Sequence, residues 1–496
     1  MLTRLRVSGF KNLVDVDVRF GPFTCIAGAN GVGKSNLLDA ITFLSNLAEL
    51  SLLDAAMSVR DEGARTGDVA SIFHRVGKSQ DKIISFDAEM IIPQSGVDDL
   101  GQPAQATTSF VKYRLDLGFR SDNGHRTPGG LEIIREELTH IRAGDAKKEL
   151  AFPVENGWFR SAISGKRWTP YYISTGETSG IRVINVHQDG GSSGKPRPLL
   201  ASNLPRTALS AANAAESPTA TLVKREMQSW KRLQLEPSAL RRPDSLTAPT
   251  QLGPDGAHLP ATLYNLAKTS RLTPEQEHTD ENRVYATVAN RLSELIEDVR
   301  IVEVEKDEKR ELLTLRVGGR DGTLHPARAL SDGTLRFLAL AVLELDPAFQ
   351  GVLCLEEPEN GIHPARIPAI LKLLQDIATD TSEPCGSDNP LRQVIINTHS
   401  PAVVAQIPED SLLVAETKRV HQDGKSFDKV SFSCLPGTWR ARLGAAEVVP
   451  KGKLLSYLSP VPKTPENGWF NQTPEPGLRR VIDNPELQLE LFGVSG

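Results

Sequence analysis

The chain has 496 residues, of which 39% are hydrophobic and 24% are charged, a length and composition that suit two or three compact units. Acidic residues number 62 against 57 Lys plus Arg, which gives a net charge of -5. This balance excludes a polycation, so any contact with nucleic acid must come from a local basic face.

The first fifty residues predict strands followed by a loop and a helix. Residues 14–20 alternate apolar and polar side chains, the period of a half-buried strand. Residues 23–27 (FTCIA) are a short apolar run that leads into a glycine-rich loop. After the loop, Leu37, Ile41 and Leu44 follow the spacing of an amphipathic helix.

The rest of the chain alternates between strand and helix signals. Further elements are predicted as strands at 82–92 and 109–119, a helical stretch at 204–232, a helix at 284–297, and a hairpin of 300–306 with 311–317. The first two of these strands predict an antiparallel sheet beside the unit that holds the loop. Helix, buried strand, helix and buried strand then occupy 333–400.

These signals divide the chain into four parts. They are an N-terminal half of one domain at 1–160, a largely helical insertion at 161–298, the C-terminal half of the first domain at 299–436, and a tail at 437–496 that is rich in Pro, Gly and Lys. No heptad pattern persists between the two halves, which excludes long coiled-coil arms.

Cysteine usage and the N-terminus predict a reducing, cytoplasmic location. The four cysteines have no C-x-x-C spacing, so neither a disulfide framework nor a zinc site is expected. Cys25 and Cys354 lie in apolar runs, where a cysteine acts as a small hydrophobe. The N-terminus lacks the apolar core of a signal peptide, and no apolar stretch approaches membrane-spanning length, so no membrane contact is expected.

The loop Gly28–Ser35 (GANGVGKS) has the pattern G-x-x-x-x-G-K-S between a strand and a helix. Its glycines let backbone N–H groups surround phosphates, Lys34 neutralises the β and γ phosphates, and the Ser35 hydroxyl ligates Mg²⁺. The alternative is a chance glycine-rich turn. ATP and Mg²⁺ are therefore the predicted cofactors, and the predicted contacts here are Asn30, Gly31, Gly33, Lys34, Ser35 and Asn36.

An acidic pair follows the buried run 352–355. Glu356 and Glu357 come at the carboxyl end of this predicted strand, where ligands bind in α/β sheets. Glu356 is predicted to hold Mg²⁺ or a water bound to it. Glu357 is predicted to orient or deprotonate the attacking water.

Two further segments suit a phosphate. Ser331, Asp332 and Gly333 begin an apolar helix, and they are either a simple helix cap or a helix start that grips the γ-phosphate of another subunit's ATP. His399 follows the buried strand VIINT and is either structural or a sensor of the γ-phosphate.

Together these segments carry a family resemblance. The set GANGVGKS, LSDGTLR (330–336), LEEPENGIHP (355–364) and NTHSP (397–401) resembles the ABC-type ATPases of the RecF/SMC/OLD group. More narrowly, it is similar to the compact bacterial "AAA family ATPase" proteins of the AAA_21 type, as are VSGFKN (7–12) and DGAHLPATL (255–263). The resemblance covers about residues 1–435.

The resemblance implies a P-loop ABC-type ATPase head, with a mixed central sheet, an antiparallel β-subdomain and a mainly helical insertion. It implies a head-to-tail dimer on ATP, or a larger oligomer, in which the partner's Ser331, Asp332 and Gly333 complete each site. Glu356 stands where Asp is commoner, and Gln80 and Gln94 are the candidates for the usual glutamine loop. The chain lacks the signature of transport ATPases and the Toprim nuclease pattern of OLD proteins, so a nuclease would be a separate chain.

The tail ends in a short motif, QLELF, at 488–492. It resembles the bacterial sliding-clamp binding pentapeptide, with Gln488, Leu489, Leu491 and Phe492 as the contacts. The alternative is a terminal strand or helix that packs on its own domain.

A basic stretch at 224–242 includes the aromatic residue Trp230. Its cations could lie along a DNA backbone, or they could form a solvated helix face. They are Lys224, Arg225, Lys231, Arg232, Arg241 and Arg242.

The leading hypothesis is an ATP-gated ATPase that acts on DNA or on a separate effector nuclease in bacterial antiphage defence or genome maintenance. One alternative is a RecF-like repair or recombination mediator recruited to the sliding clamp. Another is an ATP-stabilised scaffold with negligible turnover.

Overall fold

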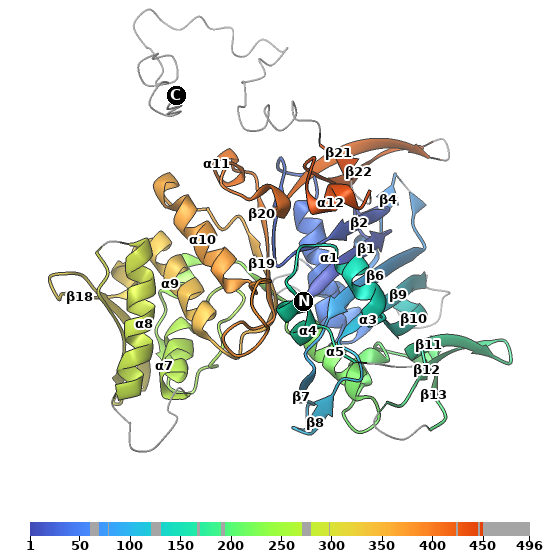
Figure 1. The fold of residues 1–496 in the computed structure, drawn as a ribbon, viewed down its shortest axis with the longest axis horizontal. Coiled ribbons are helices and arrows are strands. Elements are labelled where there is room, and N and C mark those ends of the chain that lie inside the picture. Colours follow the sequence, from blue (N-terminus) through green and yellow to red (C-terminus); the bar gives the residue numbers. More distant parts are fainter. Residues whose placement is uncertain are drawn as a thin grey trace, which may run out of the picture. The chain divides into compact units, whose positions relative to one another are not determined.

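The computed structural model describes residues 1–59, 69–77, 79–120, 130–165, 169–189, 194–269, 279–296, 298–422, 425–444 and 447–449. All of these lie in the unit Met1–Lys451. None of the helices in these ranges is long and apolar enough to cross a membrane. The elements are labelled in Figure 1.

A seven-stranded mixed sheet carries the motif segments at its centre. Its order is β14 (Lys231–Leu233), β19 (Gly351–Glu356), β20 (Arg392–Thr398), β3 (Phe23–Ala27), β21 (Leu412–Gln422), β22 (Lys425–Cys434) and β23 (Glu447–Val448). The first five strands are mutually parallel, and β21 and β22 form an antiparallel pair. Strands β3 and β20 are buried along their whole length, as continuous apolar runs in parallel sheets require.

An eight-stranded antiparallel sheet forms the second layer. Its order is β13 (Arg197–Leu200), β12 (Ile181–Val186), β11 (Tyr171–Thr178), β10 (Gly130–His140), β9 (Phe110–Arg120), β6 (Ile83–Ile91), β1 (Leu2–Ser8) and β2 (Val16–Arg19). Strand β2 alternates buried and half-buried residues, as its sequence predicts. The mixed central sheet and the antiparallel sheet confirm the predicted fold class.

Helix α1 (Lys34–Leu47) shares one apolar core with both sheets. Its Phe43 ring lies 5.8 Å from that of Phe10 and 5.7 Å from that of Phe86 on β6. The same core includes Cys354 of β19 and Ile395 of β20. Because α1 is anchored on both sides, the loop before it is held in a fixed position at the edge of the central sheet.

A third, smaller sheet and a group of helices follow in the second half of the chain. The strands are β15 (Asp244–Ser245), β17 (Leu312–Gly318), β16 (Ile301–Asp307) and β18 (Leu324–Pro326). Helix α9 (Asp332–Leu345) contacts α6 (Pro237–Leu240), α7 (Leu259–Thr269), α8 (Thr279–Leu295) and α10 (Ile367–Ile377), and Figure 1 shows these helices grouped together.

The remaining elements are short. They are α2 (Leu52–Met57), α3 (Ala143–Leu150), α4 (Asn156–Ala162), α5 (Pro218–Gln228), α11 (Pro401–Val404), α12 (Trp439–Arg442) and the hairpins β4 (Arg75–Val76) with β5 (Ser79–Gln80) and β7 (Ser95–Val97) with β8 (Pro103–Gln105).

Residues 161–298 differ from the expected helical insertion. Their first part supplies β11, β12 and β13, which extend the antiparallel sheet, and β14 joins the central sheet. The stretch 204–232 is helical only at α5 and at a short 3-10 helix, Leu209–Ala211, and its apolar residues belong to the core shared by the two sheets. The predicted hairpin of β16 and β17 is confirmed, with Asp307 opposite Leu312.

The buried cysteines behave as predicted from their apolar surroundings. Cys25 and Cys354 are free thiols with 0% and 1% exposure. Burial raises the pKa of both, to about 12 for Cys354, so both thiols stay protonated and unreactive at neutral pH.

Candidate nucleotide and magnesium site

Three neighbouring strands bring the motif residues to one edge of the central sheet. Strand β20 lies between β19 and β3, with Asn397 opposite both Glu356 and Ile26, and Thr398 opposite Ala27. All three strands are parallel, so their carboxyl ends meet at the same edge. The glycine-rich loop, the acidic pair and His399 are therefore adjacent in space, although Ser35 and Glu356 are 321 positions apart in the sequence.

The loop before α1 is built to receive an anion. No side chain caps the start of α1, and its first turn has no acidic residue, so no side chain of this turn competes with an anion for the first backbone N–H groups. Ala29, Asn30 and Gly31 are exposed at the tip of the loop. Lys34 is buried, and its Nζ donates to the carbonyls of Gly28 at 2.7 Å and Ala29 at 2.9 Å. Burial lowers the pKa of Lys34 despite the nearby charges of Glu357 and Glu359.

Asn12 supports this loop from outside the motif. Its Nδ2 donates to the Val32 carbonyl at 3.1 Å, and its Oδ1 accepts from the Asn36 side chain at 2.6 Å. The segment VSGFKN therefore supplies Asn12, which braces the loop from outside the motif. A Cβ atom on Gly33, which has φ of 108°, would lie 2.3 Å from Asn12 Nδ2.

Gly33→Ala is expected to lower the unfolding temperature more than Gly31→Ala. Gly33 and Gly31 both have positive φ, of 108° and 79°, so an alanine strains the backbone at either position by about 1–3 kcal/mol. Only at Gly33 would the methyl group also strike Asn12, since no atom lies within 4 Å of a Cβ on Gly31. Thermal unfolding without nucleotide measures both variants. Equal decreases in unfolding temperature would contradict the bracing role of Asn12.

Ser35 and Glu356 meet at the strand edge. The Ser35 hydroxyl donates to Glu356 Oε2 at 2.6 Å, and Asn397 Nδ2 lies 3.4 Å from the same oxygen. These two oxygens suit neighbouring positions around one Mg²⁺, which binds one or two protein ligands and takes the rest from water and phosphate. No group of three or more His, Cys, Asp and Glu side chains in the described part of the chain could hold a metal by itself. The donor set therefore fits Mg²⁺ that arrives with a nucleotide.

Glu357 is held in place by three neighbours. Its backbone has φ of 45°, a strained conformation for a residue with a side chain, and its N–H donates to Asn397 Oδ1 at 3.0 Å. One carboxylate oxygen lies 2.7 Å from His399 Nδ1, and the other accepts from Asn360 Nδ2 at 2.8 Å. Burial opposes ionisation, but the hydrogen bonds from Asn360 and His399 and the charge of Lys34 lower the pKa of Glu357. The side chain is therefore a fixed, ionised carboxylate at neutral pH.

A third carboxylate, Glu359, is buried in the turn that follows Glu357. It is 8% exposed and accepts from Thr398 Oγ1 at 2.5 Å, while its other oxygen has no hydrogen-bond partner among the described residues. Burial raises its pKa, against the hydrogen bond from Thr398. The sequence analysis did not single out Glu359, because a Glu in a turn is ordinarily exposed.

The start of α9 lies at a helix N-terminus, whereas the other motif residues follow strands of the central sheet. Ser331 is exposed and caps the helix by accepting from the Thr334 N–H at 3.2 Å. Arg241 donates to the Leu330 carbonyl at 3.0 Å and also pairs with Asp332. A Cβ on Gly333 would lie 3.7 Å from the Gly361 carbonyl. The segment 330–333 thus lies next to Arg241 and the turn after the acidic pair.

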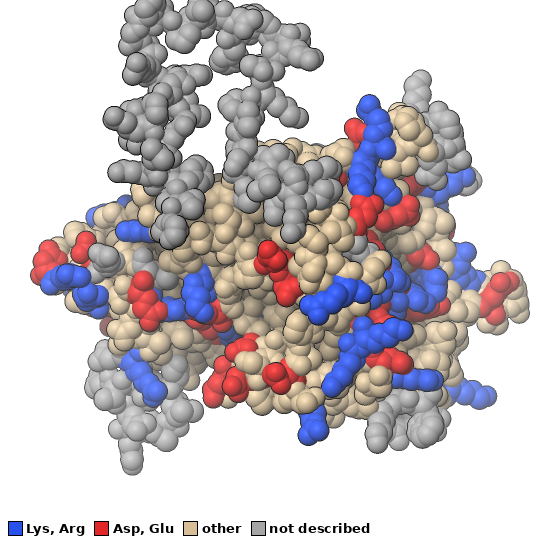
Figure 2. Space-filling view, turned by 45° about the horizontal axis from the view of Figure 1, so that its top comes forward, with Lys and Arg blue, Asp and Glu red and all other residues tan. Residues whose placement is uncertain are grey.

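The basic stretch 224–242 does not form one continuous exposed basic face. Trp230 is 4% exposed and Lys224 is 7% exposed, and Lys224 pairs with Asp99. Arg232 and Arg241 point to the nucleotide-site residues instead. On the face drawn in Figure 2, acidic and basic side chains are interspersed. Four of the six cations, Lys224, Arg225, Arg232 and Arg241, pair with carboxylates that are distant in the sequence, whereas Arg242 is exposed.

Of the two glutamine candidates, Gln94 donates to the Ser161 carbonyl of α4 at 2.6 Å. The Gln80 Nε2 is buried and has no hydrogen-bond partner among the described residues. Gln80 therefore stays the candidate for the glutamine loop. The clamp-like residues Gln488, Leu489, Leu491 and Phe492 lie outside the described residues.

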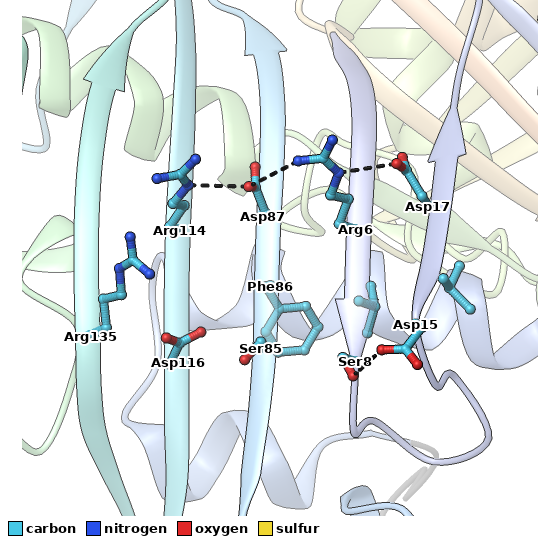
Figure 3. Close-up of a pocket in the computed structure, with 12 residues that line it drawn as sticks. Arg6, Ser8, Asp15, Asp17, Ser85, Phe86, Asp87, Arg114, Asp116 and Arg135 are labelled. Atoms are coloured by element: carbon cyan, nitrogen blue, oxygen red, sulfur yellow. Dashed lines mark hydrogen bonds and ion pairs between the residues drawn. The ribbon is translucent and has the colours of Figure 1, made fainter. Parts of the chain in front are cut away.

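A hollow of about 610 Å³ lies on the antiparallel sheet, away from these motifs (Figure 3). Arg6 of β1 lies 3.1 Å from Asp17 and 3.7 Å from Asp87, and Arg114 of β9 lies 3.2 Å from Asp87. Opposite charges thus face one another across neighbouring strands. Since its cations are already paired with carboxylates, this hollow has none of the features of an anion site.

A family profile matches more than half of the chain. The family described as "AAA domain, putative AbiEii toxin, Type IV TA system" matches residues 23–96 and 174–405. These ranges include the strand before the loop, the loop, α9, the acidic pair and His399.

Curated relatives match shorter stretches. The DNA replication and repair protein RecF of Anaeromyxobacter sp. (strain Fw109-5) is 44% identical over 139 residues, which cover 28% of this chain and 36% of RecF. RecF of Phocaeicola vulgatus is 36% identical over 64 residues, 13% of this chain and 17% of that protein. The OLD nuclease of Thermus scotoductus is 51% identical over 41 residues, 8% of each chain. The matches thus span about a third or less of these relatives.

Among solved structures, the chain is similar to an SMC head bound to the C-winged helix domain of ScpA. That match covers 88% of this chain and 98% of the other, with 15% sequence identity and a TM-score of 0.44.

Proposed function

The chain belongs to the family described as "AAA domain, putative AbiEii toxin, Type IV TA system" and is an ATPase of the RecF, SMC and OLD type; on that premise, we propose that it is an ATP-gated switch. Binding of Mg·ATP closes two copies head to tail, and hydrolysis separates them. The closed dimer acts on DNA, on a separate effector nuclease, or on both, in antiphage defence or genome maintenance. We place this activity in the cytoplasm.

The observation that carries this proposal is the arrangement of Glu357. Its ionised carboxylate is fixed between His399 and Asn360, on the residue next to Glu356, which bonds Ser35. A general base must be held within reach of the water that it activates. Here Lys34 and the start of α1 would bind the phosphates, Ser35 and Glu356 would hold Mg²⁺, and Glu357 would accept the proton of the attacking water. Bound Mg²⁺ would supply charge stabilisation at the phosphates.

The exposed start of α9 supports the dimer. Ser331 faces solvent, so a second copy can approach it. Asp332 carries a negative charge that would repel phosphate, but Arg241 neutralises it. The segment Ser331–Gly333 is therefore suited to face an ATP bound to the loop of another copy.

Similarity to RecF favours DNA as a ligand, and it also favours a second candidate function, that of a repair mediator. The sliding-clamp motif in the tail belongs to that candidate. A scaffold without turnover is less consistent with a fixed, ionised Glu357, because a scaffold has no use for a general base.

ATP turnover is expected to rise several-fold when DNA is added. The test compares single-stranded, duplex and gapped DNA, with Glu357→Gln as the hydrolysis-deficient control. Since DNA is proposed to bind the closed, ATP-bound dimer, the favoured form should also lower the ATP concentration at half-maximal rate. Turnover unaffected by all three DNA forms would contradict a DNA-acting switch. Turnover equal in wild type and Glu357→Gln would favour the scaffold.

A further inference from the structure

Arg232 of β14 joins two acidic groups beside the loop, the buried Asp39 and the half-buried Glu356. Its Nη1 lies 2.7 Å from Asp39 Oδ1, and its Nη2 forms an ion pair with Glu356 Oε1. Asp39 is fully buried on α1, whereas Glu356 ends β19. One guanidinium fork thus connects the helix after the nucleotide loop with the strand that carries the acidic pair.

The two oxygens of Glu356 are both occupied in this arrangement. Oε1 accepts a hydrogen bond from the guanidinium of Arg232, and Oε2 accepts one from the hydroxyl of Ser35 at 2.6 Å. The negative charge of Asp39 has two positive partners, Arg232 and Lys11, and Lys11 Nζ lies 2.6 Å from Asp39 Oδ2. Asp39 and Glu356 therefore both have positive partners within the protein.

A metal ion would have to share Glu356 with this guanidinium. Like charges in contact with one carboxylate repel, and the repulsion is strong where water is partly excluded. Arg232 is 24% exposed and Glu356 is 22% exposed at their side chains, so solvent screens the pair only in part. The phosphates of ATP would change this balance, because they bring negative charge and further oxygen ligands.

We propose that Arg232 is a positioning residue that takes the place of the divalent cation at Glu356 in the nucleotide-free protein, so that the cation binds only together with ATP. This inference rests on the proposed role of Ser35 and Glu356 as magnesium ligands. The consequence is that ATP and the cation load as one unit. The protein does not keep a bound metal between cycles.

The test measures Mn²⁺ binding without nucleotide, by the electron paramagnetic resonance signal of free Mn²⁺. Wild type is expected to bind Mn²⁺ weakly. Arg232→Gln should bind it at least about tenfold more tightly, because one positive charge is removed beside Glu356. The gain should vanish in Arg232→Gln combined with Glu356→Gln. Arg232→Lys keeps the charge and should bind as weakly as wild type.

A matched control is available in Arg291 of α8. This arginine is 19% exposed and also bridges carboxylates on separate helices, Glu344 at 2.9 Å and Asp376 at 2.6 Å. Arg291→Gln should lose stability in a similar way, yet leave Mn²⁺ binding unchanged. Thermal unfolding of each variant reports whether folding is retained, and Arg232→Lys gives the charge comparison if Arg232→Gln fails to fold.

The outcomes separate this inference from the proposed function. Unchanged or weaker Mn²⁺ binding by Arg232→Gln would overturn it, as would Arg232→Lys binding as tightly as Arg232→Gln. Tight binding by wild type without ATP would also overturn it. Because no step of this experiment needs hydrolysis, a protein without ATP turnover would still give a decisive result.

Discussion

Glu357→Gln is expected to lower ATP turnover by roughly 100-fold to 10,000-fold, the contribution of a positioned general base. The amide keeps the shape of the side chain and can still bond Asn360 or His399, but it cannot accept a proton. ATP binding should persist, since Lys34 and the start of α1 are untouched. The variant should therefore accumulate as an ATP-bound dimer, which size-exclusion chromatography with and without Mg·ATP detects.

The matched control for this experiment is Glu359→Gln. Glu359 lies next to the same turn, and burial raises its pKa. It is buried under Thr398, so its removal should change turnover far less than the loss of Glu357. If Glu357→Gln hydrolysed ATP at a rate within a few-fold of wild type, the role assigned to Glu357 would be wrong.

Mixing two inactive variants is expected to restore about a quarter of wild-type turnover if sites act independently. Lys34→Ala removes the phosphate cation from the loop, and Ser331→Arg places a bulky side chain at the exposed start of α9. Half of randomly mixed dimers contain one copy of each, and one of the two sites in such a dimer combines an intact loop with an intact α9 start. Steady-state ATP turnover of the mixture measures the recovery.

Lys34→Ala mixed with Glu357→Gln provides the control. The loop and the acidic pair belong to the same chain, as the contact between Ser35 and Glu356 indicates. No site in that mixture combines an intact loop with an intact Glu357, so no turnover should return. Failure of Lys34→Ala and Ser331→Arg to complement would contradict a site shared between two copies.

The nucleotide loop and the acidic pair could be predicted from sequence because their information is local. The order of strand, loop and helix around Gly28–Ser35 is visible in a few residues, and so is the buried run before Glu356. Because β19, β20 and β3 are parallel neighbours in the sheet, their carboxyl ends meet at one edge. Strands β6 and β9 of the antiparallel sheet were also predicted from sequence, β9 by its alternation.

The stretches 204–232 and 224–242 could not be interpreted correctly from local patterns. The first suggested one helix, and the cations of the second suggested either a DNA-facing surface or a solvated helix face, but Trp230 is buried and donates to Glu226 at 3.0 Å. Strand β14 is only three residues long, too short for a recognisable alternation. Its place at the edge of the central sheet depends on pairing with β19, more than one hundred residues later in the chain.

The sequence by itself predicted the groups of the candidate site: a phosphate loop, two Mg²⁺ ligands in Ser35 and Glu356, a general base in Glu357 and the polar residue His399. Only the tertiary structure decided which charges neutralise one another there. Arg232 reaches Glu356, and Arg241 reaches Asp332, across long stretches of chain. Local patterns cannot predict such pairs, because a buried charge finds its partner by proximity in the folded state, whatever their separation in the chain.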